Sequence, residues 1–147
     1  MEIQGTGAII FSMGTLEYLI HGGRIGKLKG MLASALSLKP MVAVKDGELL
    51  PMGVVRSRKG ALKKILSSFC RYVEENKIPL DQYVVATGYG YDEKEGKTFH
   101  EMAKQMLKEK YGYVKEFVNF QIGSTVGVYT GPNPIGIGLL KEANQKQ

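Results

Sequence analysis

The dipeptide Asp46-Gly47 separates two apolar runs, MVAV at 41–44 and ELLPMGVV at 48–55. Asp-Gly favours a two-residue turn whose backbone twist matches the twist of paired strands. The two runs are therefore predicted to form an antiparallel hairpin. Pro51 has no backbone N–H to donate, so the second strand is expected to lie at an edge or to contain a bulge.

Elsewhere, apolar residues alternate between strand spacing and helix spacing. The predicted strands outside the hairpin are 7–12, 82–88, 114–121 and 135–140. The predicted helices are 16–21, 28–36, 59–76 and a helix opened by the capping box Thr98 and Glu101. Residues 122–131 fit a strand or a short helix. Because the middle pair of strands is a hairpin, we predict an α/β fold, a mixed sheet with helices packed against it, in one domain over residues 1–147.

A double glycine, Gly22-Gly23, follows the predicted helix 16–21, and Arg24 comes next. One glycine is enough to end a helix. Two glycines and an arginine indicate a backbone that lies close to another group, with a cation aimed at it. Thr15 is expected to cap this helix by accepting a backbone N–H.

The net charge is +6, and the positive charge is concentrated in one part of the chain. Between Gly22 and Lys77 there are twelve lysine or arginine residues and four aspartate or glutamate residues. Arg56 and Arg58 precede the helix 59–76, where the helix dipole favours anions, so these cations need another reason such as a bound anion. No aromatic residues are interleaved with the basic residues of RSRKGALKK at 56–64, and we expect no nucleic-acid partner.

Catalytic constellations are nearly absent from the sequence. His21 and His100 lie in separate predicted helices, and His100 is expected to be solvated. The acidic residues at 92–95 are expected to form a solvated loop, and Cys70 is expected to be a small buried residue. There is no Cys/His cluster of the zinc-binding kind and no glycine-rich nucleotide motif. We therefore expect no catalytic residues, no metal, no cofactor and no enzymatic activity.

The segment MEIQGTGAIIFS lacks the basic start of a signal peptide, and its apolar run is short. No run approaches the length of a transmembrane helix. A single cysteine permits no internal disulfide, which fits a reducing compartment. We expect a cytoplasmic protein without a transmembrane segment.

Four motifs, in this order, resemble the C-terminal half of bacterial DegV-family proteins, which have the EDD fold. The motifs are TLEYLIHGGRIGKLKG, KPMVAVKDGELLP, VVRSRKGALKK and IGSTVGVYTGPNPIGIG. They cover the chain almost from end to end. The resemblance implies a non-catalytic carrier that holds a long-chain fatty acid between two domains. It also implies that the carrier presents the fatty acid to the catalytic subunit of a fatty acid kinase, which makes acyl phosphate for phospholipid synthesis.

The resemblance also implies which residues form the site. The expected fatty-acid-binding residues are Gly23, Arg24, Ile25, Leu28, Met31, Leu32, Tyr129, Thr130 and Gly131. Arg24 would supply positive charge, and the apolar residues after it would contact the acyl chain or, alternatively, form the core of the domain. Arg56, with Arg58 as a second candidate, is expected to bind the kinase partner.

Two departures from the family pattern concern the headgroup and the length. Tyr129 stands where the family has histidine before Thr-Gly-Pro, and Asn133 replaces the glycine that follows. Family members are about twice as long, and the N-terminal domain that supplies serine and threonine contacts is absent from this sequence. An apolar cleft wall would then be exposed, so self-association is expected.

Two further functions compete with this reading. One alternative hypothesis is a protein-interaction domain that docks a kinase through its basic patch without binding lipid by itself. The other is a small enzyme that acts on an acidic or phosphorylated substrate, which the missing general base argues against.

Overall fold

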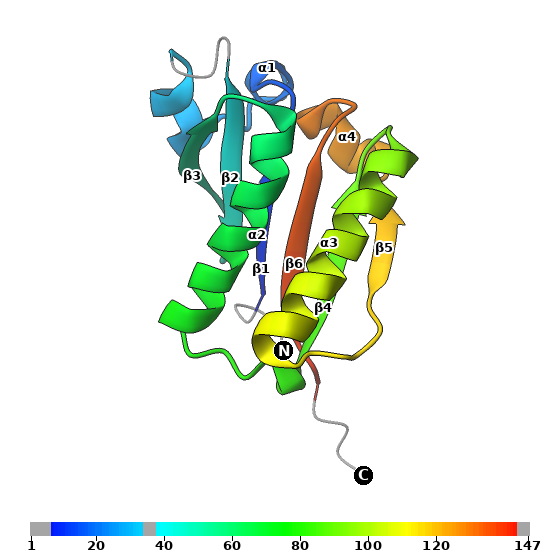
Figure 1. Ribbon diagram of the computed structural model, residues 1–147. Coiled ribbons are helices and arrows are strands. Elements are labelled where there is room, and N and C mark those ends of the chain that lie inside the picture. The colour runs from blue at the N-terminus through cyan, green and yellow to red at the C-terminus, as the bar shows by residue number, and fades with distance from the viewer. Residues whose placement is uncertain (1–6, 34–37, 144–147) are drawn as a thin grey trace.

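A six-stranded mixed sheet forms the centre of the structure (Figure 1). The strands are β1 (Ala8–Ser12), β2 (Lys39–Lys45), β3 (Glu48–Val55), β4 (Tyr83–Tyr89), β5 (Val118–Gln121) and β6 (Ile135–Lys141). Their order across the sheet is β3-β2-β1-β6-β4-β5, and only the β4–β5 pair is parallel. The computed structural model describes residues 7–33 and 38–143. The predicted α/β fold class with a mixed sheet is confirmed.

The β2–β3 hairpin forms as its turn dipeptide predicts. Asp46 and Gly47 have φ values of 52° and 76°, the positive values that a type I′ turn requires at both central positions. The register shifts farther along β3, where Gly53 has a φ of 92°. Pro51 thus lies beside a bulge on an edge strand, where its missing N–H is tolerated.

Two long helices, α2 (Arg58–Glu75) and α3 (Glu93–Tyr111), cover one face of the sheet (Figure 1). Phe69 of α2 and Phe99 of α3 are almost fully buried against that face. Val85 of β4 and Ile137 of β6 meet them from the sheet. Ser57 caps α2, because its hydroxyl oxygen accepts the backbone N–H of Gly60.

Helix α3 begins six residues earlier than the Thr98 capping box predicts. Asp92 is the N-cap, and its Oδ1 accepts the N–H of Glu95 at 3.0 Å. The prediction of a solvated loop at 92–95 is wrong, since this segment is the first turn of α3. Asp92 and Glu95 have the spacing of a capping box themselves, while Thr98 donates its hydroxyl to the carbonyl of Lys94 inside the helix.

The segment after the double glycine differs from the long helix predicted at 28–36. Helix α1 (Glu17–His21) forms as expected, and the Thr15 hydroxyl accepts the Glu17 N–H. A short 3-10 helix, η1 (Gly26–Met31), follows. The predicted continuation through 34–36 lies outside the described residues. The element at 122–131 is a helix, α4 (Ser124–Thr130), and a second short 3-10 helix, η3 (Leu80–Gln82), precedes β4.

None of the described helices is long and apolar enough to cross a bilayer.

His100 is not solvated as expected but joins three elements on the covered face of the sheet. Its Nδ1 lies 2.6 Å from the hydroxyl of Thr87, which is fully buried on β4. Thr87 donates that hydroxyl to Oδ1 of Asn119 on β5, which assigns the Nδ1–H tautomer to neutral His100. The ring also meets Phe117 edge to face at 4.7 Å. Burial lowers the pKa of His100 below its ordinary value of 6.5.

Acidification should therefore destabilise the fold through His100. The unfolded chain binds a proton at this residue near its ordinary pKa, whereas the folded chain binds it only at lower pH. The free energy of unfolding is therefore highest above the pKa of His100 in the unfolded chain. It decreases as the pH drops below that value and stops decreasing below the pKa of His100 in the folded chain. Thermal unfolding should show a midpoint that falls as the pH drops below the ordinary histidine pKa of 6.5.

The slope of that pH dependence should flatten in His100→Gln. The control is His21→Gln, because the His21 side chain is 77% exposed and should leave the slope unchanged. Equal slopes in wild type and His100→Gln would contradict this assignment.

Candidate functional site

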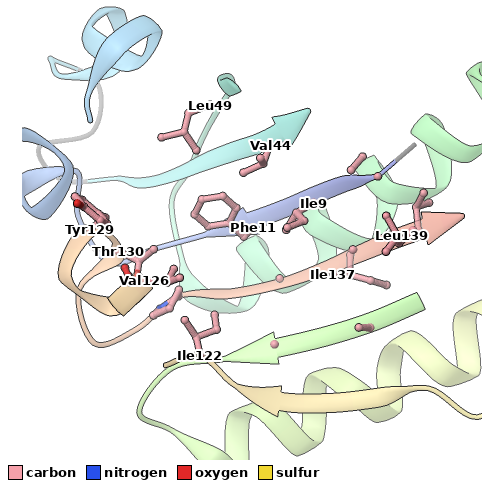
Figure 2. A pocket seen from close by; sticks show the side chains of 18 of the residues that line it. Ile9, Phe11, Val44, Leu49, Ile122, Val126, Tyr129, Thr130, Ile137 and Leu139 are labelled. Carbon is pink, nitrogen blue, oxygen red and sulfur yellow. Dashed lines mark hydrogen bonds between the residues drawn. The ribbon is translucent and has the colours of Figure 1, made fainter. Parts of the chain in front are cut away.

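The face of the sheet opposite α2 and α3 carries a large open groove with a volume of about 1290 Å³. Figure 2 shows Ile9 and Phe11 of β1 beside it, with Val44 and Leu49 of the hairpin on one flank. Ile122 and Val126 border it as well. Because most of these side chains are hydrocarbon, the groove is suited to an apolar molecule.

The floor of the groove lacks side chains along its middle. On this face, Ile9 of β1 is followed across the sheet by Gly138 of β6 and Ala86 of β4. In the neighbouring row, Phe11 is followed by Gly136 and Gly88. Gly136 is required sterically, since a Cβ there would lie 2.5 Å from the Phe11 Cβ and 2.6 Å from the Ile10 carbonyl oxygen.

One end of the groove is formed by α1, the double glycine and α4. A Cβ on Gly22 would lie 2.5 Å from Cδ1 of Tyr129, so this glycine lets the Tyr129 ring pack on the backbone. Gly23 has a φ of 67°, which favours glycine. The break thereby places the Arg24 guanidinium 5.3 Å from the centre of the Tyr129 ring, a cation–π contact. The close backbone approach inferred from the sequence is made to Tyr129.

A reciprocal contact holds α4 against α1. Gly131 has a φ of 74°, and a Cβ there would lie 2.7 Å from the Tyr18 ring. Each of the two segments therefore offers a glycine to a tyrosine of the other. The neighbouring Thr130 is buried, and its hydroxyl donates to the Gly131 carbonyl at 3.1 Å.

The two ends of the groove differ in charge. Arg24 lines the end beside α1 and α4, and Asp46 of the hairpin turn lines the opposite end. The turn lies at that opposite end because Lys45, the residue before it, pairs with Ala8 at the start of β1. An anionic group would be attracted to the Arg24 end and repelled from the Asp46 end.

Three of the nine residues expected at the ligand line this groove: Arg24, Tyr129 and Thr130. Leu28 and Met31 are buried in a second core cluster with Phe11 and Val42, because η1 packs beside β3 instead of over the open face. For them, the alternative of domain core describes the structure.

The remaining expected residues also lie outside the groove lining. Ile25 is half-buried beside the second core cluster, and Gly23 and Leu32 are exposed. Gly131 borders a smaller pocket on the other side of α4, next to Tyr18. Sequence reasoning missed the floor residues Gly136 and Gly138, although the alternation of glycine in IGIGLL was a signal for them.

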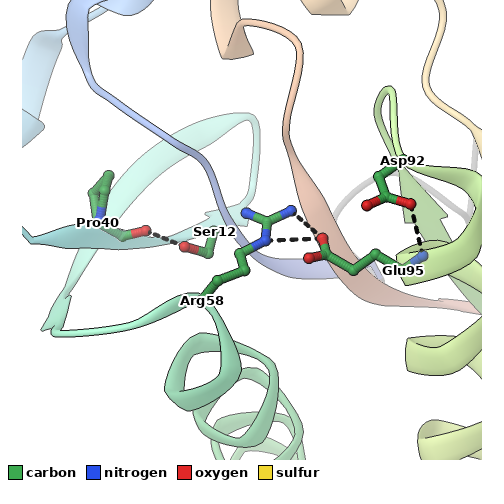
Figure 3. Close-up of polar contacts among 5 residues, drawn as sticks. All are labelled: Ser12, Pro40, Arg58, Asp92 and Glu95. Carbon is green, nitrogen blue, oxygen red and sulfur yellow. Dashed lines mark hydrogen bonds and ion pairs between the residues drawn. The ribbon is translucent and has the colours of Figure 1, made fainter.

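Arg58 at the start of α2 and Arg56 in the turn before it differ in their surroundings. Figure 3 shows that Arg58 reaches Glu95 of α3, with its Nε and Nη2 donating to Oε1 at 2.8 and 2.5 Å. Both side chains are about three-quarters buried. The anion that explains a cation at the start of α2 is thus this carboxylate. Arg56 is exposed, as are Lys59, Lys63 and Lys64. Within 7–33 and 38–143 no three His, Cys, Asp or Glu side chains are grouped to hold a metal.

Comparison with known proteins decides the family. The model of the DegV family, described as uncharacterised proteins, matches residues 2–142. The chain belongs to the DegV family. A DegV domain-containing protein of Clostridium acetobutylicum is 34% identical over 142 residues, which are 96% of this chain and 47% of that relative.

Solved structures of DegV proteins share the fold. A stearic acid-binding protein from Eubacterium ventriosum superposes with a TM-score of 0.83 at 35% identity, covering 95% of this chain and 46% of the other. A DegV family protein from Thermus thermophilus, described by its fatty acid binding, gives a TM-score of 0.76 at 27% identity, with 92% and 46% covered. The chain thus spans about half the length of these DegV relatives.

The junction of α1 and α4 should be sensitive to a single methyl group. Gly22→Ala places a Cβ against the Tyr129 ring, and relieving that overlap should cost about 1–3 kcal/mol of unfolding free energy. Urea titration measures the change. Gly30→Ala is the matched control, because a Cβ there would meet nothing within 4 Å. Equal stability of the two variants would contradict the close approach described for Gly22.

Proposed function

We propose that this chain binds the acyl tail of a long-chain fatty acid in the groove, with the carboxylate at the Arg24 end. The observation that carries the proposal is an apolar groove with a bare floor that ends at a cation on one side only. The solved DegV relatives described as binding stearic acid and fatty acid support the same ligand class.

Burial of the tail should dominate the affinity. Each methylene group removed from water contributes about 0.8 kcal/mol, whereas an exposed ion pair contributes about 0–1 kcal/mol. Arg24 is exposed, so its attraction for a carboxylate is screened by water. The head end then sets the orientation of the ligand. Arg24 supplies charge, and Tyr129 and Thr130, which line the same end, are proposed to donate their hydroxyl groups to the carboxylate.

The function that follows is that of a non-catalytic carrier in the cytoplasm. The carrier would shelter the tail and present the carboxyl group to a fatty acid kinase, whose acyl phosphate product enters phospholipid synthesis. The groove is open along the sheet and leaves large apolar side chains partly exposed, among them Ile9, Val84 and Leu140. In the absence of a lipid, this face is proposed to associate with another apolar surface, including a second copy of the chain.

Lipid binding can be tested on the purified chain. Denaturing extraction followed by mass spectrometry should recover a fatty acid from the host, and added stearate or oleate should bind to the stripped protein. Arg24→Gln should weaken binding by a few-fold at low salt, because it removes one screened ion pair. Lys77→Gln is the control, as an exposed cation at the end of α2.

The same preparation tests self-association. Sedimentation across a concentration series should show that the stripped chain associates more than the lipid-loaded chain. If no lipid is extracted and the stripped chain takes up neither stearate nor oleate, the proposal that it binds a fatty acid is contradicted.

A second surface, the exposed basic residues beside and along α2, is proposed to dock the acidic surface of the kinase. Arg56, Lys59, Lys63 and Lys64 are exposed there, whereas Arg58 is held by Glu95. This arrangement favours Arg56 over Arg58 as the contact residue. A domain that docks a kinase without binding lipid would use this surface alone.

Charge reversal separates the two arginines. Arg56→Glu should reduce binding to the kinase subunit at least tenfold with an unchanged fold, because like charges across an interface repel. Arg58→Glu should instead lower thermal stability, since it sets two carboxylates against each other at the start of α2 and α3. Kinase affinity by calorimetry and the unfolding midpoint are the two measurements. Unaltered kinase binding by Arg56→Glu would rule out this docking surface.

A further inference from the structure

The floor of the groove changes abruptly at its Asp46 end. The two rows nearer the head end carry only Gly136, Gly88, Gly138 and Ala86 on β6 and β4. In the next row, Val84 of β4 pairs with Leu140 of β6 on the same face, and both residues line the groove. Along the floor, three glycines and one alanine are therefore followed by the branched side chains of Val84 and Leu140.

The Val84–Leu140 pair stands in the path of anything that lies along the floor. The two residues are 47% and 44% exposed, so they project from the sheet instead of sinking into a core. Leu140 also leans toward the start of β1, because a Cβ on Gly7 would lie 3.1 Å from its Cδ1. Beyond them lies the hairpin turn with the Asp46 carboxylate, which disfavours an apolar tail.

We propose that Val84 and Leu140 are specificity-determining residues that stop the acyl tail and set the longest chain that binds fully. This inference rests on the proposed function. The tail lies along the β6–β4 seam between the wall formed by Ile9 and Phe11 and the wall formed by Phe120. From Gly136 to Leu140 the floor runs about 14 Å, at a rise of about 3.4 Å per strand residue.

Ala86 is the point along the floor where the stop can be moved inward. It is the one non-glycine residue of the two bare rows, it is half-buried, and it faces Gly138 across the seam. A leucine at this position would raise a branched side chain one row earlier than Val84. The tail would then lose the last part of its path while the head end stays intact.

The test measures dissociation constants for a series of straight-chain saturated fatty acids of increasing length. For wild type, each added methylene should tighten binding roughly fourfold until the tail reaches the stop, after which affinity should level off. Val84→Ala/Leu140→Ala should extend the rise to longer acids. Ala86→Leu should end the rise at a shorter acid and leave the affinity of the shortest acids unchanged.

Two controls separate the stop from general effects on the sheet. Val118→Ala removes a similar side chain from the same face, where Val118 is 61% exposed but does not line the groove. Val114→Leu enlarges an exposed residue away from the sheet. Both should keep the wild-type levelling point. Thermal unfolding midpoints show whether each variant folds. If Ala86→Leu does not fold, the double alanine variant still tests whether Val84 and Leu140 stop the tail.

The outcomes distinguish this inference from the proposed function. Wild-type binding that levels off at the same acid length in the double alanine variant would overturn the stop and leave fatty-acid binding in place. If wild type binds none of the acids, the proposed function fails and the stop fails with it. A levelling point that moves outward in one variant and inward in the other would support both.

Discussion

The strand β6 is the element on which the rest of the structure depends. Its residues alternate between Ile135, Ile137 and Leu139, which are buried among the helices, and Gly136 and Gly138, which have no side chain on the opposite face. One face can therefore hold a packed core, while on the other the groove reaches the backbone of β6 at the partly exposed Gly138. Since β6 lies between β1 and β4, its glycines are at the centre of the sheet, where a bare floor gives a groove with walls.

The head end depends on a second steric constraint, the interlocking of α1 and α4. Tyr129 packs on Gly22 and Tyr18 packs on Gly131, so each tyrosine excludes a Cβ on the other segment. Arg24 directly follows Gly22-Gly23. Its position over the Tyr129 ring is a consequence of the packing of that ring on Gly22. The Arg24 guanidinium is thus positioned by the Tyr129 ring and the Gly22 carbonyl, and within residues 7–33 and 38–143 no carboxylate forms a salt bridge with it.

Patterns that act over a few residues predicted most of the fold. Asp46-Gly47 fixed the hairpin, and the apolar stripe of 59–76 predicted α2 to within one residue at its ends. Predictions that needed tertiary information were less accurate. Leu28 and Met31 have the spacing of a helix face, but only the packing of η1 beside β3 decides that this face is core. Likewise, the burial of His100 depends on Thr87 and Asn119, which are far from it in the sequence.

The groove and the basic surface lie on opposite sides of the sheet, which bears on how a carrier of this kind would work. The lipid tail would lie on the open face, while the exposed lysines of α2 lie on the helix that covers the other face and Arg56 lies in the turn that leads into it. A partner docked on α2 would not cover the floor of the groove. Figure 1 shows α1 and the start of α2 at the same end of the sheet, and Arg24, three residues after α1, lines the groove. Under the proposed function, a kinase docked on the basic surface would reach the ligand from its carboxyl end, the end at which phosphoryl transfer would take place.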